Sequence, residues 1–124
     1  MSYEKEAHER WGKADAYREY SRKTASYTEE KWQEVNRGLN EIFARLGKLN
    51  EEGLSPTSDS AKALVKELQG YITENYYTCT DEILASLGET YATDERFREN
   101  IDKYGEGTAL FTSKAIEAYL GKAL

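Results

Sequence analysis

The sequence predicts a small all-α domain, and three observations carry this prediction. The 124 residues suit one compact domain. Apolar residues recur at spacings of three and four over most of the chain, which is the period of an amphipathic helix. Valine occurs only at positions 35 and 65, and no segment alternates β-branched with polar residues as a strand does. We therefore expect helices joined by short links, without a sheet.

The clearest predicted helix follows Thr28. Threonine is a good N-cap, and the two glutamates that come next lie at the positive end of the helix dipole. Gly53 and Pro56 end the pattern, so residues 54–59 are expected to form a loop. One face of this helix carries its apolar residues: Trp32, Val35, Leu39, Ile42, Phe43, Leu46 and Leu49. We expect this stripe to be buried.

Shorter helices follow along the rest of the chain. Each begins at a serine, threonine or aspartate, whose side chain can accept a hydrogen bond from a backbone N–H of the first turn. The expected limits are residues 58–60 to Thr78, Thr80 to Tyr91, Thr93 or Asp94 to Gly105, and Thr108 onward. Together with the helix after Thr28, these segments form an ordinary helical body over residues 28–124.

The first 27 residues differ from this body, because they contain charged residues but no Leu, Ile, Val or Phe. Their large apolar groups are aromatic: Tyr3, Trp11, Tyr17, Tyr20 and Tyr27. Such a segment can form helices, which Gly12 would interrupt, but it has little to bury by itself. Either this segment docks on the body through its aromatic residues, or it stays loose until a ligand supplies a surface. We expect the second, with residues 1–27 as a conditionally ordered lid segment on a single domain spanning residues 1–124.

Charge and composition exclude several classes of function. The net charge is −6 with no basic block, which disfavours direct binding of nucleic acid. No run of 18 apolar residues exists, and no apolar segment follows Met1 as in a signal peptide. A single cysteine fits a reducing compartment. We expect a cytoplasmic protein that interacts with neither membrane nor DNA.

Cys79 is the one residue with distinctive chemistry. Its place before a predicted helix N-terminus favours a thiolate, whereas Asp81 and Glu82 disfavour one. The only histidine, His8, is distant in sequence, so a catalytic pair would require the lid segment to fold over Cys79. The alternative is a small buried residue at a helix corner. No spacing typical of a metal site or phosphate loop is present, and we expect no catalytic residue, metal or cofactor.

Three groups of motifs, in order along residues 3–119, resemble the TipAS antibiotic-recognition domain. The first is Glu9-Arg10-Trp11-Gly12 with Asp15-Ala16-Tyr17 and Ser26-Tyr27-Thr28, the second is Tyr76-Tyr77-Thr78-Cys79-Thr80, and the third is Tyr91-Ala92-Thr93-Asp94 with Arg96-Phe97 and Asn100-Ile101-Asp102-Lys103-Tyr104. Each motif is weak alone. In register over the whole chain, they identify the sequence as similar to this family.

The resemblance implies a globin-like all-α fold with a deep cleft for a bulky, largely apolar antibiotic, such as a thiopeptide or albicidin. In the family the domain is typically the effector part of drug-sensing activators of the MerR family, and the N-terminal segment can become ordered around the ligand. The cysteine at the matching turn can add to a dehydroalanine of a thiopeptide, so the resemblance implies an accessible, ligand-facing Cys79 as an alternative to a buried one.

This chain also departs from the family. Thiopeptide-binding relatives carry histidines and a tryptophan on the helix before the cysteine, where this chain has Leu68, Gln69, Tyr71 and Asn75. The DNA-binding helices and the dimerising coiled coil of the full activators are not in the sequence. We expect either an autonomous short form that sequesters a drug or a part of a longer regulator.

The leading hypothesis is a binding module that captures a hydrophobic antibiotic without transforming it. Aromatic side chains suit this, because they cover large apolar rings and keep polar edges for amides. The residues expected to bind the ligand are Trp11, Tyr17, Tyr20, Tyr27, Tyr76, Tyr77, Cys79 and Phe111, with Cys79 as a point of covalent attachment. The alternatives are a helical protein-interaction module without a small ligand and a thiol enzyme that uses Cys79.

Overall fold

The computed structural model describes residues 13–121, and every regular element within this range is an α-helix. The expected all-α class is thus confirmed over this part of the chain. The helices are α2 Lys13–Thr24, α3 Glu29–Glu51, α4 Asp59–Asn75, α5 Asp81–Thr93, α6 Glu95–Asp102 and α7 Thr108–Tyr119. None of the described helices is long and apolar enough to cross a membrane.

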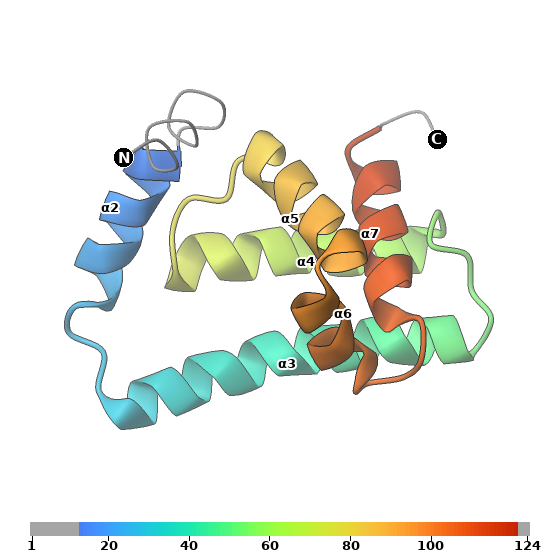
Figure 1. Ribbon diagram of the computed structural model, residues 1–124, viewed down its shortest axis with the longest axis horizontal. Coiled ribbons are helices and arrows are strands. Elements are labelled where there is room, and N and C mark those ends of the chain that lie inside the picture. The colour runs from blue at the N-terminus through green and yellow to red at the C-terminus, as the bar shows by residue number, and fades with distance from the viewer. Residues whose placement is uncertain (1–12, 122–124) are drawn as a thin grey trace.

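The helices form a body with one outlying element (Figure 1). α3 and α4 lie side by side and run in opposite directions, and α5, α6 and α7 cover them. α7 is central, because it packs against α3, α4, α5 and α6. α2 stands at the end of the body where α3 begins and α4 ends. The space between α2 and the body is where the candidate site lies.

Helix starts agree with the expected caps except at Thr108, which is the first residue of α7; Gly107 is the N-cap there, without a side-chain hydrogen bond. The hydroxyls of Thr28, Ser58 and Thr80 each accept a hydrogen bond from a backbone N–H three residues later, at 3.1–3.2 Å. Asp94, one of two expected caps, accepts from the N–H of Arg96 at 3.0 Å. Each bond satisfies a backbone donor that has no partner inside its helix.

Two helix ends differ from the expectation. α4 ends at Asn75 and not near Thr78, so Tyr76 is its C-cap and not an inner helical residue. α6 ends at Asp102, and two tight turns at Gly105 and Gly107, both with positive φ, lead into α7. These glycines adopt a backbone conformation that other residues rarely tolerate.

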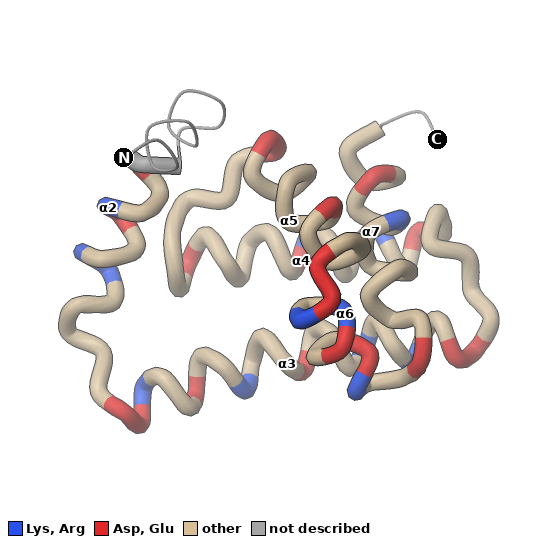
Figure 2. The backbone as a smooth tube through the Cα atoms, in the orientation of Figure 1, with Lys and Arg blue, Asp and Glu red and all other residues tan. Residues whose placement is uncertain are grey.

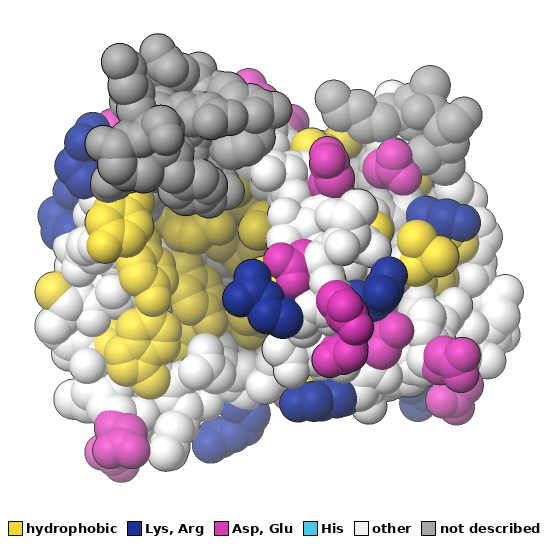
Figure 3. All heavy atoms as spheres, viewed as in Figure 1, with side chains coloured by type: hydrophobic (Ala, Val, Ile, Leu, Met, Phe, Trp, Pro, Cys, Tyr) yellow, Lys and Arg dark blue, Asp and Glu magenta, His cyan; other side chains and the backbone are white. Residues whose placement is uncertain are grey.

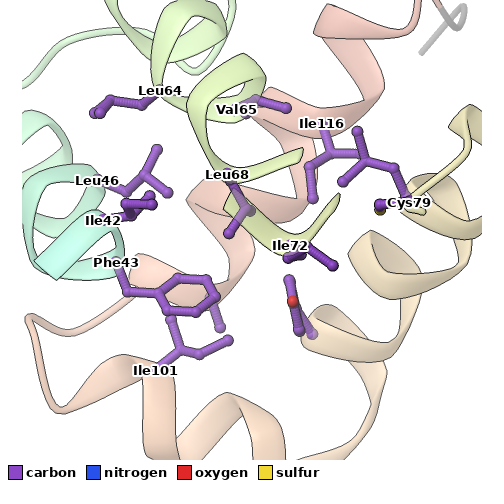
Figure 4. Packing of buried hydrophobic residues seen from close by; sticks show 14 of the residues in the cluster. Ile42, Phe43, Leu46, Leu64, Val65, Leu68, Ile72, Cys79, Ile101 and Ile116 are labelled. Carbon is purple, nitrogen blue, oxygen red and sulfur yellow. The ribbon is translucent and has the colours of Figure 1, made fainter. Parts of the chain in front are cut away.

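The core lies among α3, α4, α5 and α7, and Figure 4 shows its apolar side chains converging. Leu46, Leu68, Leu84 and Ile116 are less than 2% exposed. The stripe expected on α3 is largely confirmed, with Val35, Ile42, Phe43 and Leu46 buried and Leu39 and Leu49 half-buried. Trp32 is the exception, because it packs toward α2 and not into this core.

Candidate ligand-binding recess

Four aromatic side chains from different parts of the chain meet between α2 and the body. They are Tyr20 of α2, Tyr27 of the following link, Trp32 of α3 and Tyr76 after α4, here called the aromatic wall. Trp32 contacts the other three, with ring centroids 5.2–6.3 Å away. Tyr20 stacks on Tyr76 at 6.4 Å with the ring planes 8° apart. Tyr27 packs edge-on against Trp32, and the other two pairs are tilted; stacked and edge-on arrangements are the ones that aromatic rings prefer.

The aromatic wall remains partly exposed, since all four of its residues are half-buried. Figure 3 shows hydrophobic side chains gathered in a hollow over α2, the beginning of α3 and the end of α4. Tyr27 donates its hydroxyl to the carbonyl of Asn75 at 2.6 Å, and Tyr76 donates to the side-chain oxygen of Asn36 at 3.2 Å. Burial raises the pKa of Tyr76 to about 12, so its hydroxyl stays protonated. The wall therefore presents ring surface, and it contains no residue with a formal charge.

Besides the ring contacts of Tyr20, polar contacts hold α2 to the body. The carboxylate of Glu19 accepts from the backbone N–H of Thr78 at 2.8 Å and from its hydroxyl at 2.9 Å. The hydrogen bond from that N–H lowers the pKa of Glu19. Lys23 donates to the carbonyl of Thr73 at 2.9 Å. Only Ala16 of α2 is buried among the residues with described side chains.

The linker 76–80 between α4 and α5 carries no charged residue (Figure 2) and contains Cys79. Side chains of α4 hold its backbone: Gln69 donates to the carbonyl of Cys79 at 2.8 Å, and the hydroxyl of Thr73 accepts from its N–H at 3.1 Å. The thiol side chain is only 4% exposed. Burial, with a smaller contribution from Asp81, raises its pKa to about 12. Cys79 is thus an enclosed, protonated thiol.

Comparison with known proteins identifies the domain. The family model described as the TipAS antibiotic-recognition domain matches residues 3–119. The chain belongs to the TipAS family. Its predicted resemblance is confirmed over nearly the whole sequence.

Relatives of this TipAS domain are transcriptional activators. The chain is 40% identical over 116 residues to the HTH-type transcriptional activator TipA of Streptomyces coelicolor, covering 94% of the chain and 46% of that protein. It is 33% identical over 119 residues to the HTH-type transcriptional activator mta of Bacillus subtilis, covering 96% of the chain and 45% of that protein. The chain therefore spans about half the length of the curated relatives it matches.

Solved structures show the same fold. The complex of nosiheptide with TipAS, from a thiopeptide antibiotic multidrug resistance system of Streptomyces lividans, matches with a TM-score of 0.80 and 39% identity, covering 96% of this chain and 83% of that one. The antibiotic-binding domain of a TipA-class multidrug resistance transcriptional regulator matches with a TM-score of 0.65 and 32% identity, covering 73% of this chain and 96% of that one.

The structure of this TipAS domain brings together some of the predicted ligand-binding residues. Tyr20, Tyr27 and Tyr76 form the aromatic wall. Tyr17 is 61% exposed on α2, and Phe111 is 4% exposed in the core, where it has almost no surface left for a ligand. Trp11 and His8 lie outside the described residues.

The remaining two predicted residues, Tyr77 and Cys79, lie on the same linker as Tyr76. Tyr77 is half-buried against the core, and burial raises its pKa to about 12. The accessible, ligand-facing Cys79 that the resemblance implied is not what the structure shows; the buried alternative is found. The reason is that α4 side chains satisfy both backbone groups of Cys79 and so hold the linker against the body.

Sequence reasoning missed Trp32, the residue that joins the wall. The helical period placed it on the buried stripe of α3, and period alone cannot tell which part of a stripe extends past the core. The available signal was its position in the first turn of α3, five residues after Tyr27. The described residues also contain no group of three or more His, Cys, Asp or Glu able to hold a metal ion.

The buried thiol leads to a test of Cys79. In native protein at pH 8, we expect iodoacetamide to modify Cys79 about 100-fold more slowly than in urea-unfolded protein, because only the exposed thiolate reacts. The reaction is followed by intact mass spectrometry. Modification at equal rates in both states would contradict the enclosed thiol.

The same thiol affects stability at high pH. Its pKa is raised from 9.0 to about 12 in the fold, so its contribution to stability is complete below pH 9 and is lost as the pH rises toward 12. Tyr76 and Tyr77 add to this loss in the same direction above pH 10. Urea unfolding of the protein and of Cys79→Ala at pH 8 and pH 10.5 separates the contributions: we expect the variant to lose less stability between the two values.

Proposed function

We propose that this domain binds a bulky, largely apolar antibiotic of the thiopeptide type in the recess formed by the aromatic wall. One observation carries this proposal: four aromatic rings, from α2, the link after it, α3 and the end of α4, stay half-buried around a hollow, which leaves apolar area for a ligand. Such rings stack on flat apolar groups, while the oxygen atoms of the tyrosine hydroxyls can accept hydrogen bonds from amide N–H groups. The solved TipAS complex with nosiheptide supports the same class of ligand.

The role that follows is recognition without turnover. The thiol of Cys79 is enclosed and protonated, which favours reversible binding over covalent attachment. We infer that the domain either removes the drug by mass action or reports it, as the effector part of a MerR-type activator, to a linked DNA-binding half. The similarity to HTH-type transcriptional activators supports the second form. A DNA-binding partner domain would be cytoplasmic, and we propose the same location for this domain.

The lid segment has a place in this proposal. α2 forms one side of the recess and buries little apolar area of its own, so a ligand that contacts Tyr20 would stabilise it in place. We propose that residues 1–27 close over the bound antibiotic and that residues 28–124 form the body.

Nosiheptide is the direct probe. At a free concentration of about 100 times Kd, binding contributes about 2.7 kcal/mol to the stability of the folded state, which corresponds to a rise in Tm of roughly 10 °C for a domain of this size. Differential scanning fluorimetry measures the rise, and intact mass spectrometry of the same sample reports whether an adduct forms on Cys79.

Leu110→Ala supplies the matched control for this experiment. Leu110 is 49% exposed on α7, so the variant should keep both the fold and the Tm rise of the unchanged chain. A Tm that does not respond to nosiheptide would overturn binding of this ligand. An equal rise for helical proteins outside the family would show that the effect is unspecific.

A further inference from the structure

A second hollow of about 340 Å³ opens between α3 and α6. Leu39 and Asn40 of α3 line one side, and Phe97 and Asn100 of α6 line the other. Phe97 is 43% exposed although it is large and apolar. None of the residues predicted from the sequence to bind a ligand lines this hollow, and it is separate from the contacts that make the aromatic wall.

The same face of α3 connects the hollow to the aromatic wall. Trp32, Asn36 and Asn40 are spaced by four residues, so they follow one another along one side of the helix. The distance from Trp32 to Asn40 along the axis is about 12 Å at 1.5 Å per residue. The side-chain oxygen of Asn36 accepts a hydrogen bond from the hydroxyl of Tyr76, which belongs to the wall. Asn40, one helical turn later, lines the hollow. One elongated molecule lying along α3 would reach both places.

Phe97 is fixed in position by other aromatic residues. Its ring centroid is 6.1 Å from that of Tyr91, which in turn packs edge-on against Phe43 at 5.6 Å. Tyr91 and Phe43 are buried, so this stack anchors the exposed ring to the core. An exposed aromatic side chain that is held in place loses little conformational entropy when a ligand covers it.

The polar residues of the hollow indicate the chemistry of its occupant. Asn40 and Asn100 are exposed, and their carboxamides can donate to and accept from peptide groups. Among the described residues of the lining, Lys103 is the only charged one, in a chain of net charge −6. By contrast, the hollow of about 500 Å³ between α5 and α7 carries Glu89 and Glu117 in its wall. The hollow beside α6 therefore suits a neutral peptide better than a cation.

We propose that the hollow between α3 and α6 is a second subsite for the peptide antibiotic, occupied by the part of the molecule that extends past the aromatic wall. Phe97 covers an apolar ring of the ligand, and Asn40 and Asn100 bind its amide groups. The inference rests on the proposed function, because the occupant is the same antibiotic. It assigns ligand selectivity to α6, an element that lies far along the chain from the lid segment.

The test measures nosiheptide binding by isothermal titration calorimetry to the unchanged chain, to Phe97→Ala and Asn100→Ala, and to the control Leu110→Ala. Because Asn100 is exposed and Phe97 is 43% exposed, these variants should fold, which circular dichroism checks. We expect Phe97→Ala to raise Kd about tenfold, Asn100→Ala to raise it several-fold and Leu110→Ala to leave it unchanged. Hydrogen exchange of the unchanged chain should show slower exchange in residues 95–104 with ligand.

The possible outcomes separate this inference from the proposed function. If the unchanged chain binds nosiheptide, but Phe97→Ala and Asn100→Ala bind as tightly as Leu110→Ala and residues 95–104 exchange equally with and without ligand, the second subsite is overturned and the proposed function stands. If the unchanged chain does not bind nosiheptide, both are overturned for this ligand. Weaker binding by both α6 variants together with protection of residues 95–104 supports the subsite.

Discussion

Replacing Trp32 by alanine is expected to weaken nosiheptide binding about 100-fold. Trp32 contacts Tyr20, Tyr27 and Tyr76, so its loss removes ligand contacts and also takes away the ring against which the others are placed. Tryptophan residues at the centre of an interface are frequent hot spots, and a loss of about 2.7 kcal/mol corresponds to a 100-fold change in Kd. Quenching of tyrosine and tryptophan fluorescence or calorimetry measures the change.

Trp32→Phe is the matched variant. It keeps an aromatic ring in the wall and should lose no more than about tenfold in affinity, because most of the ring contacts remain. Thermal unfolding without ligand shows whether the helical body of either variant is still folded. We expect it to be, because Trp32 lies outside the core cluster. Equal affinity of Trp32→Ala and the unchanged chain would contradict the assignment of the wall as the binding surface.

Gly47→Ala is expected to cause the largest loss of stability, about 3 kcal/mol or complete failure to fold. Gly47 is buried where α3 passes the link between α6 and α7. A Cβ atom here would lie 2.5 Å from the backbone carbonyl oxygen of Tyr104 and 2.9 Å from the hydroxyl of Thr108. The link cannot easily move, because Thr108 is fully buried, so α3 must shift against the body.

Gly70→Ala provides the control for this prediction. Gly70 is an exposed residue inside α4, and a Cβ atom there would meet nothing within 4 Å. Because alanine has a higher helix propensity than glycine, this variant should gain about 0.5–1 kcal/mol. Urea unfolding of both variants under the same conditions measures the difference. A Gly47→Ala variant as stable as the unchanged chain would show that the body tolerates a shift of α3.

Much of the fold could be predicted because local chemistry determines it. Thr28, Ser58 and Thr80 begin helices through their own hydroxyls, and the sequence shows them directly. The buried stripe on α3 could also be predicted from the sequence, because apolar residues at helical spacing indicate a single buried face. These features need no knowledge of any other part of the chain.

The features that the sequence could not show depend on contacts between distant residues. Tyr76 fits the period of α4, yet the helix ends one residue earlier, where Gln69 and Thr73 hold the linker at Cys79 instead of continuing the helix. The burial of Cys79 has the same origin. Neither Gln69 nor Thr73 looks unusual in the sequence. A polar residue on a helix gives the same sequence pattern whether its side chain points into solvent or hydrogen-bonds to a linker.

The site divides in the same way. The excess of aromatic residues indicated a binding surface for an apolar ligand, and Tyr20, Tyr27 and Tyr76, which meet in the structure, were among the residues predicted to bind it. Their meeting with Trp32 depends on where α2 lies, and the contact between Glu19 and Thr78 that places α2 joins residues 59 positions apart. The periodicity of apolar residues gives no information on a contact between residues so far apart in the sequence.

The way α2 is attached also affects how the molecule opens. Its hydrogen bonds to the body come from Glu19 and Lys23, and Tyr27 of the following link adds one more, whereas every residue of the buried core cluster except Ala16 lies after α2. Among the residues of α2 with described side chains, the only apolar ones that the body covers are Ala16 and Tyr20, so we expect α2 to detach as a small cooperative unit at a free energy below that of global unfolding. A large molecule could therefore enter and leave by the release of one helix, while the core stays folded.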